Sequence, residues 1–236
     1  MTALKKIKKL GTAISRATLK RDWYRDAVGG MWERMGKLQF DFLRERGLRP
    51  DHYLLDVGCG SLRGGIHFIR HLEPGHYFGI DSSTELLSAG RSELKRNGLA
   101  HKRPVLARME DFDFKSLQQT FDWAIAQSVF THLPIKSIMR CISNMEGSLA
   151  EGGRFYATFF DNPNGKLNLA PILHHCDDKT LTTFFDKDPY HYSFETFQFI
   201  CQGSSLKVEC LGDWGHPRDQ QMMVFIKNPI LHLSTG

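Results

Sequence analysis

The spacing of hydrophobic positions changes repeatedly along the chain and predicts alternating strands and helices. From residue 52 onward, short apolar runs alternate with longer segments in which apolar residues recur every three or four positions. Short apolar runs are typical of strands buried in a parallel sheet, and the longer spacing is typical of amphipathic helices. The expected strands are 53–57, 77–80, 104–107, 121–126 and 154–160, and the expected helices are 62–72, 84–97 and 134–150.

The pattern changes near the end of the chain. Residues 193–202 predict a helix with Ser193 as its N-cap, and 206–211 and 221–226 predict two strands with no helix between them. Strands joined without a crossover helix pair antiparallel. The expected fold is therefore α/β, Rossmann-like and doubly wound, with helices on both faces of a mostly parallel seven-stranded sheet that ends in an antiparallel hairpin.

Three further segments complete the expected organisation. Residues 1–21 predict a basic amphipathic helix, which contacts an anionic membrane surface peripherally, stays solvated and frayed, or packs on the domain by its Leu/Ile stripe. Residues 22–50 predict a helical cap, with a helix at 31–46 that ends before Gly47. The main domain is 51–236, and within it 161–192 fits no regular element and is expected to form a lid-like insertion, because such long loops are usually functional.

Charge and cysteine content narrow the class of protein. Residues 1–21 hold seven of the 31 Lys and Arg and no acid, so the rest carries 24 basic and 26 acidic residues, a balance of −2. A slightly acidic body makes nucleic acid an unlikely partner. The chain has no apolar run of 18 residues and no secretory signal pattern, and its five cysteines are scattered. We expect reduced thiols and a cytoplasmic protein, with the membrane surface as a possible second location.

A glycine-rich turn follows the first expected strand of the main domain. Residues 54–65 read LLDVGCGSLRGG, with four glycines in the last eight positions. Ligands of open α/β sheets bind at such a turn, and an acid about 20 residues on accepts hydrogen bonds from a ribose. Asp81 stands 21 residues after Gly60. A dinucleotide site would have the spacing GxGxxG, but Arg63 occupies the third glycine's position. Asp56 instead suits a ligand with an amino-acid end, because it could hold an ammonium group.

Together these stretches resemble the class I S-adenosylmethionine (SAM) dependent methyltransferases. LLDVGCG, with Asp81 after YFGI, is similar to motif I and the acidic end of the second strand in that family. MEDFDF (109–114), FDWAIAQSVFTHLP (121–134) and LAEGGRF (149–155) follow in the family's order, so the resemblance covers about residues 50–160. It implies SAM as cofactor and S-adenosylhomocysteine as product.

The resemblance also implies a set of cofactor-binding residues. Asp56, Gly58, Cys59 and Gly60 would line the methionine end of the cofactor, and Gln127 and Ser128 would lie below its sulfonium. Asp81 would bind the ribose hydroxyls, with Ser82 beside it. The adenine would contact Phe112 and either Glu110 or Asp111. Phe112 could equally be a core aromatic. Many members carry an acid near the position of Arg108, so the adenine contact here is open between Glu110 and Asp111.

Transfer of a sulfonium methyl group is an in-line displacement, for which the protein aligns the reactants and excludes water. A hydroxyl acceptor also requires a base. The candidates at the carboxyl rim of the sheet are His132, Asp161, His191 and His216, each of which could instead make a structural hydrogen bond. Adjacent His174 and His175 lack a metal-ligand spacing, so no metal is expected.

The segment AQSV after the fourth strand differs from the NPPY and Pro-Cys patterns of nucleic-acid methyltransferases. With the aromatic and His-rich insertion, it favours a small polar acceptor such as a sugar, glycan or natural-product hydroxyl, and therefore an O-methyltransferase. Two alternatives remain open from the sequence: an NAD-dependent oxidoreductase and a non-catalytic SAM-binding module. The oligomeric state is not indicated.

Overall fold

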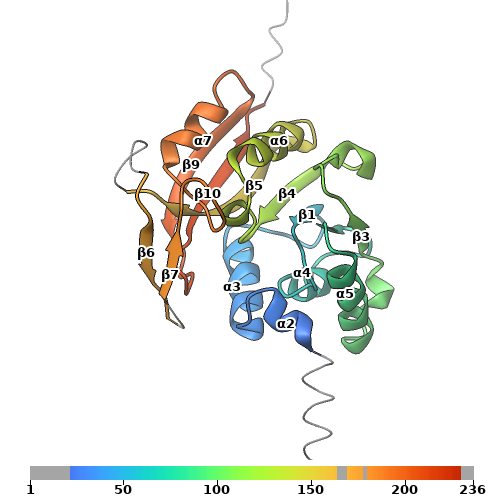
Figure 1. The fold of residues 1–236 in the computed structure, drawn as a ribbon. Helices are drawn as coiled ribbons and strands as arrows, with labels where there is room; N and C mark the ends of the chain where they lie inside the picture. Colours follow the sequence, from blue (N-terminus) through green and yellow to red (C-terminus); the bar gives the residue numbers. More distant parts are fainter. Residues whose placement is uncertain (1–21, 164–168, 178–179, 230–236) are drawn as a thin grey trace, which may run out of the picture.

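The computed structural model describes residues 22–163, 169–177 and 180–229, and Figure 1 shows how their elements are arranged. The expected helix at 1–21, with its possible membrane contact, lies outside the described residues and stays a prediction. Within the described residues, no helix is both long and apolar enough to cross a bilayer.

Seven strands form one continuous path in the main sheet. Their order is β3-β2-β1-β4-β5-β10-β9, with β1 to β5 parallel and β10 antiparallel to both β5 and β9. The bounds are β1 (Leu54–Val57), β2 (Tyr77–Asp81), β3 (Val105–Arg108), β4 (Phe121–Ala126), β5 (Leu149–Asp161), β9 (Leu206–Asp213) and β10 (Gln221–Lys227). The predicted doubly wound sheet with a terminal hairpin is confirmed. Its order reverses between β1 and β4, where ligands of such sheets bind.

Helices cover both faces of the sheet, as expected (Figure 1). Apolar residues of α3, α4 and α5 form a buried cluster on one face, and those of α6 and α7 form a second cluster on the other. The helices are α2 (Trp23–Ala27), α3 (Trp32–Glu45), α4 (Gly65–His71), α5 (Thr84–Arg96), α6 (Ile135–Glu146) and α7 (Phe194–Ile200), with 3₁₀ turns η1 (Ala100–Lys102), η2 (Phe114–Leu117) and η3 (Phe130–His132).

The predicted start of one helix was wrong. The pattern favoured a helix from residue 62, but α4 begins at Gly65. Leu62 has a φ of +71°, a left-handed conformation that a regular helix does not contain. The side chain of Leu62 is fully buried, so packing against the core holds this unusual backbone in place.

The prediction that 161–192 lacks regular structure was also wrong in part. β6 (Ile172–His175) and β7 (Thr180–Thr183) pair antiparallel as a separate two-stranded sheet, and β8 (His191–Tyr192) pairs parallel with the end of β5. Figure 1 places β6 and β7 at the side of the main sheet. The hydrophobic pattern did not predict β6 and β7 because polar residues, His174 and Thr183, occupy the buried positions of these short strands.

Candidate active site

A cavity of about 530 Å³ lies where β1, β2, β4 and β5 end. Most of the residues predicted for the cofactor or for catalysis contribute to its wall: Asp56, Gly58, Cys59, Gly60, Asp81, Ser82, Gln127, Ser128, His132 and His216. Residues far apart in sequence therefore converge at the point where the strand order reverses, as the doubly wound fold requires.

The glycine turn brings bare backbone to the cavity. Gly58 and Gly60 have φ values of +71° and +54°, which glycine adopts without steric cost. The Gly60 amide donates to Asp81 Oδ2 at 2.9 Å, and the Ser83 amide donates to Asp81 Oδ1 at 2.8 Å. Each carboxylate oxygen accepts more than one hydrogen bond. Asp81 is thus fixed in orientation and can still accept from a ribose diol.

Asp56 is buried in β1, just before the glycine turn. Its Oδ2 accepts a hydrogen bond of 2.6 Å from the Tyr77 hydroxyl. Burial raises the pKa of Asp56 to about 7, while the Tyr77 hydrogen bond lowers it and the charge of Asp81 raises it. A cation beside this carboxyl would favour its ionised form. Asp56 therefore fits an ammonium group, and neighbouring Cys59 is a neutral thiol because burial raises its pKa well above the usual value.

Arg63 connects the end of β4 to the N-terminal cap. Its Nη2 donates to Gln127 Oε1 at 2.8 Å, and its Nη1 donates to the carbonyls of Val28 and Gly30 at 2.6 and 3.0 Å. Burial, with the nearby charge of Arg218, lowers the pKa of Arg63 to about 10, which leaves it charged at neutral pH. The sequence marked Arg63 only as a departure from the dinucleotide pattern.

The predicted sulfonium-side residues belong to one polar network. Gln127 Nε2 lies 2.5 Å from Ser128 Oγ and 3.1 Å from His216 Nε2. The Ser128 amide donates to Thr158 Oγ1, and both hydroxyls donate to Gln220 Oε1. Ser128 has a φ of +57°. These hydrogen bonds fix the strained turn after β4 against the wall of the cavity.

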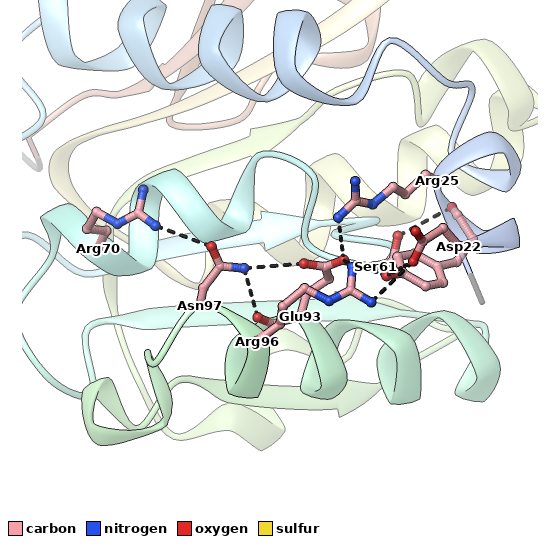
Figure 2. A network of polar contacts seen from close by, with 8 residues as sticks. Asp22, Arg25, Ser61, Arg70, Glu93, Arg96 and Asn97 are labelled. Carbon is pink, nitrogen blue, oxygen red and sulfur yellow. Dashed lines mark hydrogen bonds and ion pairs between the residues drawn. The ribbon is translucent and has the colours of Figure 1, made fainter. Parts of the chain in front are cut away.

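Part of the segment predicted as a cap, 22–50, lines the cavity. Residues 26–29 line the cavity, and Arg218 Nη2 donates to the Gly29 carbonyl at 2.9 Å. At its outer end, α2 is attached to α5 through Glu93, which Figure 2 shows among Arg25, Arg96 and Asn97. Glu93 is 1% exposed, so its charge is stabilised by these donors and not by water.

The four predicted bases occupy different positions. His132 lines the cavity, and its Nδ1 lies 2.6 Å from Asp188 Oδ1, with both side chains more than half exposed. His216 lines the cavity and is buried beside Gln127. Asp161 and His191 are not among the lining residues. Asp161 ends β5 with its pKa raised by partial burial, and His191 is buried in β8.

The three predicted adenine contacts lie apart from the cavity wall. Glu110 pairs with Arg108, Asp111 accepts a hydrogen bond from the Asp113 amide, and Phe112 packs against the core. The wall nearest the end of β2 is made instead by Ser82 and Leu86. The assignment of the adenine to Glu110, Asp111 and Phe112 stays a prediction, and Leu86 is a residue that sequence reasoning missed.

The fold is Rossmann-like, and two acids, Asp56 and Asp81, line the cavity at the point where its strand order reverses. Comparison with sequence families narrows the class, because residues 54–153 match the family described as a methyltransferase domain. This part of the chain is therefore similar to methyltransferase domains, in agreement with the resemblance of its motifs to the class I SAM-dependent methyltransferases.

Two known relatives match about half of the chain each. The chain is 33% identical over 119 residues to a protein named probable fatty acid methyltransferase from Pseudomonas putida, covering 49% of this chain and 29% of that protein. It is 30% identical over 107 residues to an uncharacterized protein of Methanocaldococcus jannaschii, covering 44% and 27%. The matches therefore span less than a third of the length of these relatives.

Solved structures share the fold over most of its length. A SAM-dependent methyltransferase from Clostridium acetobutylicum aligns with a TM-score of 0.64 at 12% identity, covering 91% of this chain and all of that one. A sugar N-methyltransferase from Streptoalloteichus aligns with a TM-score of 0.62 at 18% identity, covering 88% and 92%. An amino pentose methyltransferase from Micromonospora echinaspora gives 0.61 at 15%, covering 91% and 97%.

No cluster of three or more His, Cys, Asp or Glu side chains suited to a metal ion occurs in the described part of the chain. The expectation of a metal-free enzyme stays a prediction.

Proposed function

We propose that this protein transfers the methyl group of SAM to an oxygen of a small polar acceptor, such as a sugar, glycan or natural-product hydroxyl. One observation carries the proposal: Asp81, oriented by the Gly60 and Ser83 amides, shares a cavity with the buried carboxyl of Asp56. That pair of acids suits a ligand with a ribose at one end and an ammonium group at the other.

The residues present fit this cofactor. Asp56 would hold the ammonium group, Asp81 the ribose hydroxyls, and the bare backbone of Gly58 and Gly60 would contact the ligand between them. When bound, the cofactor supplies an activated methyl group. The chain's own residues then orient the acceptor and exclude water, and the cap tied down by Arg63 and Arg218 is suited to the second task.

The acceptor side of the cavity supports a polar substrate. Its wall includes His132, His216, Arg218 and Gln220, which offer hydrogen bonds, together with Phe160 and Leu181, which offer apolar contacts. A polar small molecule with an apolar face suits this mixture. The solved structures named as sugar and amino pentose methyltransferases support an acceptor of this size.

An amine acceptor is the second candidate, because one of the similar structures is named a sugar N-methyltransferase. Chemical analysis of the methylated product separates the two, since an O-methyl ether and an N-methylamine differ in basicity and in methyl proton shift. The product of an oxygen acceptor is expected.

Titration calorimetry with S-adenosylhomocysteine tests the cofactor, with NAD and NADH as comparison ligands. We expect saturable binding of S-adenosylhomocysteine and none of the nicotinamide dinucleotides at the same concentrations. Tight binding of NADH alone would instead support an oxidoreductase. Binding of S-adenosylhomocysteine without methyl transfer to any acceptor would support a non-catalytic module.

A further inference from the structure

A buried guanidinium lines the cavity, and all of its hydrogen bonds go to uncharged groups. Arg63 is 9% exposed. Its three acceptors are the backbone carbonyls of Val28 and Gly30 and the side-chain carbonyl of Gln127. No ion pair joins Arg63 to any residue that the structure describes. A charge removed from water is costly unless an opposite charge compensates it, so Arg63 favours an anion in the space that it borders.

Two N–H groups of Arg63 remain available to a ligand. A guanidinium carries five N–H groups. Nη1 uses both of its hydrogens on Val28 and Gly30, and Nη2 uses one on Gln127. Within the described part of the chain, Nε makes no hydrogen bond and is not among the buried atoms that lack a partner, so it faces open space. The open space that Arg63 borders is the cavity.

A second guanidinium adds positive charge at the same place. A Cβ added at Gly29 would lie 3.7 Å from Arg63 Nη1 and 3.1 Å from Arg218 Nη1, so both groups approach the same point of the cap. Arg218 also lines the cavity. Burial, and then the charge of Arg218, lowers the pKa of Arg63, which means that the two cations repel. An anion close to both would offset this repulsion.

The neighbouring Asp56 indicates which kind of anion fits. Burial is the largest influence on the pKa of each group, but Arg63 also lowers the pKa of Asp56, and Asp56 raises that of Arg63. The two charges are therefore close together in the cavity wall. In an α-amino acid, the ammonium and the carboxylate are attached to one carbon, so a single ligand can place one at Asp56 and the other at Arg63. A carboxylate also matches the paired N–H groups of a guanidinium in geometry.

We propose that Arg63 forms a carboxylate subsite in the cavity, with Nε–H and the remaining Nη2 hydrogen as its donors. The carboxylate belongs either to the amino-acid end of the cofactor or to an acidic acceptor, and the experiments below separate these two sources. This inference rests on the proposed function, since both are ligands of the methyl transfer. Arg63 binds and orients one of them, and no bond is made or broken at its guanidinium.

Calorimetry with two ligands tests the cofactor as the source. S-adenosylhomocysteine is compared with its decarboxylated analogue, which keeps the adenosine, the thioether and the ammonium group. We expect the wild-type protein to bind S-adenosylhomocysteine about 10- to 100-fold more tightly, the range for hydrogen bonds to a charged group. In Arg63→Gln this ratio should fall to nearly one. Arg63→Lys keeps the charge but loses the paired donors, and should keep part of the preference.

The ratio of the two affinities isolates the carboxylate from the structural role of Arg63. Arg63→Gln also releases the carbonyls of the cap, but that change weakens both ligands alike and leaves the ratio unaffected. Arg91→Gln is the matched control, because Arg91 also donates to a backbone carbonyl, that of Leu106, and does not line the cavity. Its ratio should equal that of the wild type. Thermal unfolding without ligand checks the fold of each variant, and Arg63→Lys carries the test if Arg63→Gln does not fold.

A transfer assay tests the acceptor as the source. In that case, the wild-type protein binds S-adenosylhomocysteine and its decarboxylated analogue equally. Label from SAM with a labelled methyl group then enters small molecules of a host extract that an anion exchanger retains. Arg63→Gln should lower the rate of this transfer at saturating SAM about tenfold or more, whereas Arg91→Gln should not change it.

The outcomes separate this inference from the function beneath it. A preference for S-adenosylhomocysteine that Arg63→Gln retains in full would place the carboxylate elsewhere and overturn the subsite. Equal binding of the two ligands by the wild type, with labelled products that an anion exchanger does not retain, would also overturn it and leave the methyl transfer intact. Absence of S-adenosylhomocysteine binding by the wild type would remove the proposed cofactor, and the subsite with it.

Discussion

The hydroxyl of Tyr24 donates a hydrogen bond to the buried carboxylate of Glu93, across 69 positions of sequence. This contact joins the short helix α2 to α5, and α2 leads directly into the residues that cover the cavity. Burial, followed by the Glu93 hydrogen bond, raises the pKa of Tyr24 to about 12. The phenol is therefore a permanent donor at physiological pH.

Tyr24→Phe removes this donor and keeps the ring. Because a hydrogen bond to a charged group contributes about 1.5–3 kcal/mol, we expect the free energy of unfolding to fall by about that amount. Tyr53→Phe is the matched control, since the Tyr53 hydroxyl makes no hydrogen bond with the described residues and its ring stacks on His76. Urea denaturation measures both variants. Equal stability of the two would show that Glu93 does not depend on Tyr24.

Gly60→Ala tests the contact between the glycine turn and the cap. A Cβ at Gly60 would lie 2.8 Å from Val28 Cγ1, and the backbone has a positive φ. Gly75→Ala isolates the conformational cost, because Gly75 has a φ of +87° and no atom within 4 Å of the added Cβ. We expect the control to lose about 1–2 kcal/mol of stability, the cost of a left-handed conformation, and Gly60→Ala to lose more.

Adding Val28→Ala removes the atom that the new Cβ would strike. The double variant should recover the excess loss of Gly60→Ala, and a double-mutant cycle of thermal unfolding gives the coupling. The double variant should also recover the affinity for S-adenosylhomocysteine that Gly60→Ala alone loses. Strict additivity of the two changes would contradict the close approach of cap and turn.

Asp81→Ala should weaken cofactor binding by about 1.5–3 kcal/mol, the range for hydrogen bonds to a charged group. Asp81→Asn keeps one acceptor oxygen and should lose less. Because Asp81 also accepts from the Gly60 and Ser83 amides, unfolding of each variant is measured without ligand to separate loss of fold from loss of contact. Glu209→Ala is the control for calorimetry, because this partly exposed acid of β9 does not line the cavity. Undiminished affinity in Asp81→Ala would remove the ribose assignment.

The raised pKa of Asp56 predicts how the free energy of unfolding and cofactor binding change with pH. Its folded-state pKa of about 7 lies above the unfolded value of 3.8, so between these values the folded protein holds a proton that the unfolded chain has lost. Stability should therefore fall as pH rises from about 4 to about 7 and level off above it. Asp56→Asn should remove this part of the pH dependence and should match the wild type most closely at low pH.

The same group links proton release to ligand binding. An ammonium group beside Asp56 favours the ionised carboxylate, so affinity for S-adenosylhomocysteine should increase as pH rises through about 7, with release of protons below that value. Calorimetry in buffers of different ionisation enthalpy measures the protons released. Equal proton release by wild type and Asp56→Asn would place the ammonium group elsewhere.

Much of the fold was predictable because its strands and helices carry strong local patterns. β1, β2 and β4 are short and nearly fully buried, and α5 ends before Gly98, whose φ of +66° suits a helix terminus. The parallel sheet follows from their alternation with helices. β6 and β7 were missed because four-residue strands whose buried positions are polar have no hydrophobic period to detect.

Part of the candidate site could also be predicted from the sequence, and part could not. Asp56, Gly58, Gly60 and Asp81 lie at or next to the carboxyl ends of β1 and β2, so the topology of the sheet alone brings them together. Two sets of hydrogen bonds depend instead on tertiary packing between segments with no fixed spacing in sequence. One set surrounds Glu93, and the other joins the side chains of Asp219, His174, Thr183 and His191. In the sequence, Glu93 is one of several charged residues of α5. Its role in attaching α2 to α5 becomes visible only from the four side chains that donate hydrogen bonds to it in the structure.

The central claim is methyl transfer to a small polar acceptor, and one measurement tests it most directly. SAM carrying a labelled methyl group is incubated with the protein and an extract of the native host. Small metabolites, lipids or polysaccharide, protein and nucleic acid are then separated and counted. The account predicts label in the small-molecule or glycan fraction, and less label with Asp81→Ala. Label in protein or nucleic acid, or no transfer despite measured cofactor binding, would contradict it.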